Sequence, residues 1–108
     1  MGNANCSRVV TIVNPQGMHL RPADLFVKTA NRFQAEVFVS KGSDKIEGRS
    51  LLSLLTLGAV QGSQLTLHAT GPDAAEAVSA LAELVAQGFG EMPREGAAES
   101  EVGSGEAR

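Results

Sequence analysis

The segment from Asn14 to Ala23 constrains the fold more than any other part of the chain. Its first four residues, Asn-Pro-Gln-Gly, are typical of a tight turn. Pro22 then opens a run of apolar residues at helical spacing, and proline is tolerated in the first turn of a helix, whose amides have no intrahelical acceptor. The segment therefore predicts a turn followed by a helix that begins just before Pro22, with His19 at or beside the N-cap.

This placement suggests a chemistry for His19. Unpaired amides and the positive end of the helix dipole converge at such a position, and both favour anions, phosphate above all. Arg21 adds a guanidinium group that can bind two phosphate oxygens at once. A neutral imidazole is nucleophilic near pH 7, and its attack on a phosphoryl donor gives a labile phosphoramidate.

We therefore interpret His19 as a phosphoryl acceptor. The guanidinium of Arg21 and the backbone amides of Leu20 and Arg21 are expected to stabilise the phosphate charge. Gly17 is expected to let the backbone approach a partner closely.

The rest of the chain alternates short strands and helices. The first helix is expected to end near residues 32–33, and the further expected elements are strands over residues 8–13, 35–40, 45–47 and 64–70 and helices over residues 51–57 and 73–88. Ser50 is a preferred N-cap residue, and Asp73 with Glu76 matches a capping box for the last helix. The order βαββαβα predicts an α+β fold, an open-faced β-sandwich in which three helices lie on one face of a four-stranded antiparallel sheet.

Composition narrows the function. The chain has 108 residues, of which 43% are hydrophobic, so we expect one domain over residues 1–91 and a disordered, small and acidic tail over residues 92–108. A net charge of −3 and the absence of Trp and Tyr argue against nucleic-acid binding. The longest apolar run is too short to span a bilayer, and the single cysteine, Cys6, is expected in a frayed terminus. These features predict a cytoplasmic monomer without metal or cofactor.

The segment Gly17-Met18-His19-Leu20-Arg21-Pro22-Ala23 resembles the Gly-x-His-x-Arg-Pro-Ala motif of HPr. HPr is the histidine-containing phosphocarrier protein family of the bacterial phosphoenolpyruvate:sugar phosphotransferase system. A second family block, a basic residue and serine followed by an apolar helix and a glycine, matches residues 49–58. The resemblance runs from about Val9 to Glu91. Leu20 departs from it, because many members carry alanine there.

The resemblance implies roles for individual residues. His19 would accept the phosphoryl group on Nδ1 from phosphorylated enzyme I and pass it to histidines of enzyme IIA domains. The chain would then be a relay in sugar transport and not an enzyme in its own right. Ser50 would be a regulatory phosphorylation site for a serine kinase/phosphorylase. The apolar residues of the short helix would divide between a docking patch for partners (Leu51, Leu52 and Leu55) and the core (Leu54 and Leu57).

Two other functions stay open at this stage. One is a regulatory HPr-like protein of a nitrogen-branch or degenerate system, in which phosphorylation only switches partner docking. The other is a small hydrolase of the acylphosphatase type, in which the loop before the first helix holds phosphate and the histidine is not needed. The second histidine, His68, stands alone on a strand position that should face solvent, and we expect no catalytic role for it.

Overall fold

A four-stranded antiparallel sheet forms the base of the structure, a computed structural model that describes residues 4–92. The strands are β1 (Ala4–Thr11), β2 (Glu36–Lys41), β3 (Asp44–Glu47) and β4 (Gln64–Gly71), and their order across the sheet is β1-β4-β2-β3. Because β4 lies between β1 and β2, Leu67 pairs with Arg8 on one side and with Val39 on the other. The alternation predicted for the strand at residues 64–70 is confirmed, since Leu65, Leu67 and Ala69 are buried.

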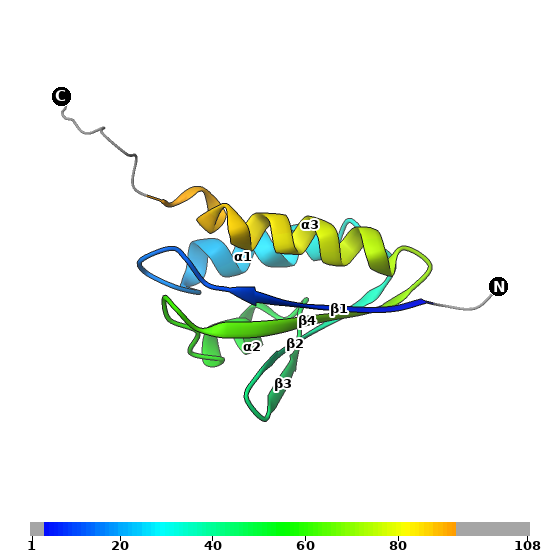
Figure 1. Cartoon of the computed structure of the whole chain (residues 1–108), viewed down its shortest axis with the longest axis horizontal. Helices are drawn as coiled ribbons and strands as arrows, with labels where there is room; N and C mark the ends of the chain where they lie inside the picture. Colours follow the sequence, from blue (N-terminus) through cyan, green and yellow to red (C-terminus); the bar gives the residue numbers. More distant parts are fainter. Residues whose placement is uncertain (1–3, 93–108) are drawn as a thin grey trace.

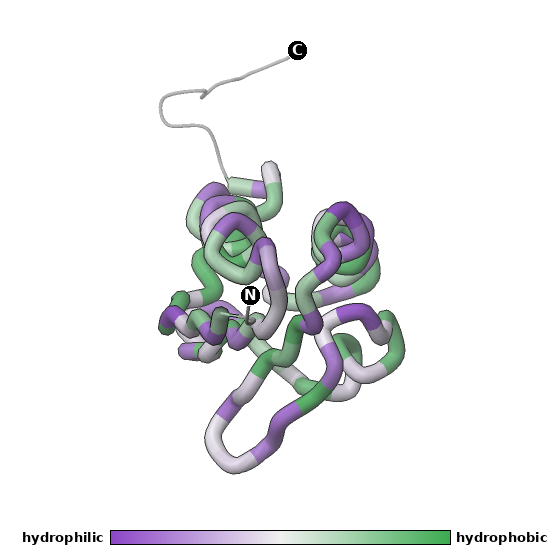
Figure 2. The backbone as a smooth tube through the Cα atoms, turned by 90° about the vertical axis from the view of Figure 1, so that its right-hand side faces the viewer, coloured by the Kyte–Doolittle hydropathy of each residue, from purple (hydrophilic) through white to green (hydrophobic). Residues whose placement is uncertain are grey.

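Two long helices, α1 (Leu20–Ala30) and α3 (Ala74–Ala86), cover one face of this sheet (Figure 1). The short helix α2 (Leu51–Thr56) packs against α1 and contacts β3. Figure 2 shows the two long helices next to each other and the β2–β3 hairpin projecting away from them. Phe26 of α1, Leu54 of α2 and Leu81 of α3 are fully buried in the common core. The predicted α+β open-faced sandwich, with the order βαββαβα, is confirmed.

The opposite face of the sheet carries Ser7, His68 and Phe38, which lie beside one another by strand register. His68 is half-buried there, and its Nε2 lies 3.0 Å from Ser40 Oγ. The residue is therefore paired within the sheet surface and does not stand alone.

The first strand differs from the prediction at both ends. It begins at Ala4, so Cys6 pairs with Ala69 and is half-buried, and the expectation of a frayed terminus at Cys6 was wrong. The strand ends at Thr11, although backbone hydrogen bonding to the neighbouring segment continues at Ile12. The backbone of Ile12 exchanges hydrogen bonds with the loop before β4, donating to Ser63 O (2.9 Å) and accepting from Gly62 N (2.8 Å).

Two further expectations concern the chain ends and membranes. Of the predicted tail over residues 92–108, all but Met92 lies outside the described residues. None of the helices within residues 4–92 has the length and apolar character needed to cross a bilayer.

The capping box expected for the last helix does not form. Asp73 is the N-cap of α3, but its carboxylate makes no capping hydrogen bond. It accepts instead from the amides of Gln34 (2.9 Å) and Ala35 (2.8 Å) in the connection between α1 and β2. The carboxylate thus accepts hydrogen bonds from amides that are distant in sequence, and a local sequence motif does not reveal such contacts.

Arg49 binds carbonyl oxygens at the end of α1 and in the same connection. Its Nη2 donates to the carbonyl oxygens of Ala30, Phe33 and Ala35. The backbone hydrogen bond from Gln34 lowers the pKa of Asp73 below its ordinary value of 3.8, against the opposing effect of desolvation, and the charge of Arg49 contributes in the same direction. The connection between α1 and β2 is therefore held by two side chains: Asp73 binds its amides, and Arg49 binds its carbonyl oxygens.

We predict that Asp73→Asn lowers the melting temperature at pH 7. A carboxyl group whose folded-state pKa is lowered stabilises the fold above its unfolded-state pKa, and this stabilisation disappears as the pH falls through the folded-state value. The difference from wild type should therefore shrink below about pH 4. Thermal unfolding followed by circular dichroism between pH 2 and pH 7 measures the difference in melting temperature. Glu47→Gln, on the exposed hairpin, is the control.

Candidate functional site

The turn before α1 presents His19. The amide of Gly17 donates to Asn14 O (3.1 Å), and the amide of Met18 donates to Ala59 O (2.9 Å). Gly17 has φ +69°, and a Cβ at this position would lie 2.5 Å from Ala59 O. The turn is therefore docked so closely on the chain at Ala59 that only glycine fits.

His19 is the N-cap of α1, as the sequence predicts. Its backbone is extended, and its carbonyl accepts from Ala23 N (3.0 Å). The imidazole makes no capping hydrogen bond, so it is left available for other contacts. Pro22 is fully buried in the first helical turn, and the amides of Leu20 and Arg21 belong to that turn, in which amides lack intrahelical acceptors.

The carboxylate of Glu91 is the main feature of the site that the sequence analysis missed. His19 Nε2 lies 2.9 Å from both Glu91 Oε1 and Glu91 Oε2. Arg21 Nη1 donates to Glu91 Oε2 (3.1 Å) and to Phe89 O (3.0 Å). Gly88 and Gly90 flank Phe89 in the sequence and indicate a turn before Glu91. Nothing in the neighbouring residues indicates that this turn lies against His19, which is 72 residues from Glu91.

Asn14 joins the turn to the same carboxylate. It is fully buried, and its Nδ2 donates to Gly17 O (2.8 Å) and to Glu91 Oε1 (3.1 Å). Among the described residues its Oδ1 has no hydrogen-bond partner. An orphaned buried acceptor is costly, so the two donated bonds are what hold this side chain in place.

Glu91 is charged at neutral pH. Desolvation raises the pKa of this carboxyl group, but the hydrogen bonds from His19, Asn14 and Arg21 outweigh desolvation and lower the pKa below its ordinary value of 4.5. The side chain of Glu91 is 17% exposed and that of His19 is 35% exposed. The site therefore combines a partly exposed imidazole with an ionised carboxylate behind it.

The second predicted block also forms as expected. Ser50 is the N-cap of α2, and its Oγ accepts from Ser53 N (3.2 Å). Leu54 and Leu57 are buried in the core, as predicted. Leu52 is 72% exposed, whereas Leu51 and Leu55 are half-buried against the core, so Leu52 is the most accessible leucine of the predicted patch. Leu20, beside His19, is 61% exposed.

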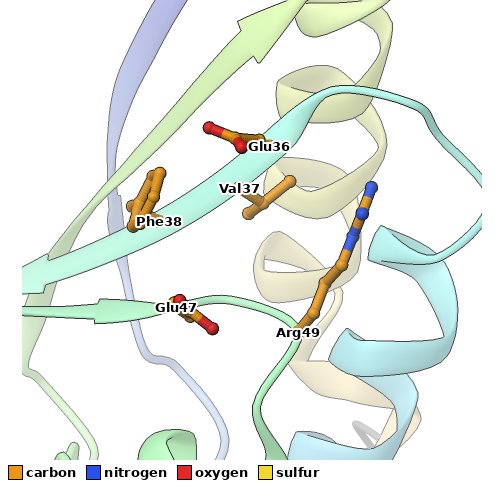
Figure 3. A pocket seen from close by; sticks show the side chains of 5 residues that line it. All are labelled: Glu36, Val37, Phe38, Glu47 and Arg49. Carbon is orange, nitrogen blue, oxygen red and sulfur yellow. The ribbon is translucent and has the colours of Figure 1, made fainter.

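Two hollows in the surface differ in how they relate to this site. One hollow lies between β2 and β3 and is lined by Glu36, Val37, Phe38, Glu47 and Arg49 (Figure 3). Its Arg49 is committed to carbonyl groups at the C-terminal end of α1, the end opposite His19. A second hollow is lined by Pro15, Gln16 and Glu91 and therefore borders the site. Within residues 4–92 there is no group of three or more His, Cys, Asp or Glu residues that could hold a metal ion.

Comparison with known proteins identifies the family. The family model "PTS HPr component phosphorylation site" matches residues 6–87. The chain belongs to the HPr family. Its function is that of a phosphocarrier of the bacterial phosphotransferase system, which confirms the resemblance seen in the sequence and decides against a hydrolase of the acylphosphatase type.

Individual relatives agree. The phosphocarrier protein HPr of Neisseria meningitidis is 38% identical over 82 residues, covering 76% of this chain and 92% of the relative. The HPr-like protein Crh of Bacillus subtilis is 42% identical over 69 residues, covering 64% of this chain and 81% of the relative. The crystal structure of HPr-C-His from Thermoanaerobacter tengcongensis superposes with a TM-score of 0.79 at 38% identity, covering 82% of this chain and 99% of that structure.

We predict that Gly17→Ala destabilises the fold by about 1–3 kcal/mol, because it combines a strained backbone with a steric clash. Gly42→Ala is a matched control, because Gly42 has a similar φ of +60° but nothing within 4 Å of its added Cβ. Urea unfolding of the two variants separates strain from clash. Equal losses of stability would show that the contact with Ala59 contributes nothing.

Proposed function

We propose that His19 is the residue of this HPr family member that carries the phosphoryl group, on Nδ1. The proposed donor is the phosphohistidine of enzyme I, and the proposed acceptors are histidines of enzyme IIA domains. The observation that supports this assignment is the position of a partly exposed His19 at the N-terminus of α1, with Arg21 two residues further on. Helix N-terminal amides and a guanidinium group favour a phosphate in this position.

The transfer requires few parts. A lone pair of the imidazole forms an N–P bond while the P–N bond to the donor histidine breaks and its electron pair stays on the donor ring. The amides of Leu20 and Arg21 and the guanidinium of Arg21 would stabilise the charge on the phosphoryl oxygens. The same step in reverse loads the acceptor, so we propose a cytoplasmic relay that carries the phosphoryl group between partners and does not act as an enzyme by itself.

We propose that partners dock on the surface formed by Leu51, Leu52 and Leu55. This docking patch belongs to α2, which packs against α1, the helix that carries the acceptor at its N-terminus. Exposed apolar side chains such as Leu52 commonly mark protein contacts.

Ser50 lies at the start of the same helix, and we propose that a serine kinase/phosphorylase modifies it. The present hydrogen bond from Ser53 N shows that an oxygen at this position caps the helix. Phosphate is compatible with a helix N-terminus, so the fold should tolerate it, while the added charge would weaken apolar docking.

The remaining proposals concern the extent of the phosphocarrier domain and the oligomeric state of the chain. Residues 1–91 are assigned to the phosphocarrier domain, and this assignment includes Glu91 because its carboxylate contacts His19. The expectation that the chain acts as a monomer stays a prediction.

Intact-mass analysis after incubation with enzyme I, Mg²⁺ and phosphoenolpyruvate tests the central proposal. We expect wild type to gain one acid-labile phosphate and His19→Ala to gain none. His68→Ala is the control with one histidine removed elsewhere, and it should be phosphorylated like wild type. A phosphate that persists in His19→Ala would place the acceptor at another residue.

We predict that Leu52→Glu slows phosphoryl transfer from enzyme I by about tenfold or more while the fold stays intact, because it places a charge in an apolar contact. The control is Val9→Glu, which adds the same charge at a site that is 60% exposed on β1. Rapid-quench transfer kinetics and thermal unfolding measure the two effects. Equal rates for both variants would remove the docking role of α2 and, with it, the proposed effect of charge at Ser50.

A regulatory function is the second candidate, because the relatives include the HPr-like protein Crh. In that case phosphorylation of His19 or Ser50 would switch partner docking without onward transfer. Phosphoryl flow from the loaded chain to an enzyme IIA domain distinguishes the carrier from the switch.

A further inference from the structure

We propose that Glu91 is a positioning residue for phosphoryl transfer. Its carboxylate holds a proton on His19 Nε2, keeps the lone pair on Nδ1 for attack, and stabilises the positive charge that the ring acquires. This proposal rests on the function proposed for His19.

The contact geometry assigns the proton. Both oxygens of Glu91 lie 2.9 Å from His19 Nε2, and an ionised carboxylate only accepts hydrogen bonds. The proton in this contact must therefore be on Nε2. A neutral imidazole carries one N–H, so its other nitrogen, Nδ1, carries the lone pair. The structure thus points to Nδ1 as the nucleophile from the contacts of Nε2 alone.

The backbone is bent specifically to deliver this carboxylate. After α3 the chain passes through three successive residues with left-handed φ: Gly88 (+64°), Phe89 (+55°) and Gly90 (+74°). A bulky residue in this region is rare and costs on the order of 1–3 kcal/mol. The side chain of Phe89 is 1% exposed, so burial of its ring offsets the strain.

Three contacts then hold Glu91 in place. Its amide donates to Gly88 O (2.8 Å), and its carboxylate accepts from Arg21 Nη1 and Asn14 Nδ2 (3.1 Å each). Arg21 also donates to Phe89 O, so the strained residue and the carboxylate are tied to the same guanidinium. These donors keep the carboxylate ionised, which agrees with its lowered pKa.

The charge balance of the reaction explains what the carboxylate contributes. When the Nδ1 lone pair of His19 forms the N–P bond, the P–N bond of the donor breaks and its electron pair remains on the donor ring, which is protonated on its second nitrogen and therefore changes from cationic to neutral. The His19 ring keeps its Nε2 proton and becomes cationic. Glu91 lies against this proton and stabilises the cation, as a buried aspartate stabilises the imidazolium of a serine protease. When the phosphoryl group leaves, the electron pair returns to Nδ1 and the ring is neutral again.

Two measurements on the full chain test the proposal, with Glu91→Gln as the variant. Glutamine keeps the size and one acceptor oxygen but removes the charge. Glu76→Gln is the matched control, because it makes the same change at an exposed position in the first turn of α3.

The first measurement is NMR of the unphosphorylated protein and needs no partner. We expect wild type and Glu76→Gln to show a His19 Nε2–H signal shifted downfield by the carboxylate and protected from solvent exchange. In Glu91→Gln this signal should move upfield or be lost to exchange. A wild-type ring that carries its proton on Nδ1 would overturn the proposal, even if the variant failed to fold.

The second measurement is single-turnover transfer from phosphorylated enzyme I. Glu91→Gln should still gain its phosphate on His19 but about tenfold more slowly, which corresponds to about 1.4 kcal/mol of lost transition-state stabilisation. Glu76→Gln should transfer at the wild-type rate. An unchanged rate in Glu91→Gln overturns the role of Glu91 and leaves the carrier function standing. Absence of phosphate on wild-type His19 overturns both.

Discussion

The contact between the backbone at Gly17 and Ala59 is the constraint on which the site depends. The absence of a side chain at Gly17 lets the turn lie against the loop that precedes β4, and the hydrogen bond from Met18 to Ala59 fastens it there. This contact lies directly before His19, the N-cap of α1, and so fixes where the helix begins. The imidazole of His19 is thus presented by a turn that is hydrogen-bonded to the rest of the fold, as preorganised chemistry requires.

The site is assembled from both ends of the described chain. Its imidazole and guanidinium groups come from the segment before and within α1, whereas its carboxylate comes from the turn after α3. Asn14 spans the two, because one amide nitrogen bonds to Gly17 of the turn and to Glu91. For the phosphoryl transfer to Nδ1 proposed above, the carboxylate must act on the other nitrogen of the ring. The contact of Glu91 with Nε2 satisfies that condition and, in the proposed mechanism, leaves phosphate binding to Arg21 and the helix amides.

The differences between expectation and structure share one cause. Asp73 matched a capping box, but in the fold the amides of Gln34 and Ala35 come within reach of its carboxylate and bind it instead. Cys6 was expected to fray, yet β4 offers it a partner strand. Glu91 was interpreted only as the end of the domain. In each case the deciding partner lies more than 30 residues away, where local propensity and spacing carry no information.

The sequence by itself determined the element order, the βαββαβα fold class and the placement of His19 and Arg21 at the start of a helix. These follow from periodicity, turn chemistry and the tolerance for proline in a first turn, which are properties of neighbouring residues. Only the tertiary structure decided that Asp73 clamps the α1–β2 connection and that Glu91 binds the imidazole. Such contacts depend on how the chain packs around the sheet. They join groups that are far apart in sequence, and no periodic pattern of residues indicates them.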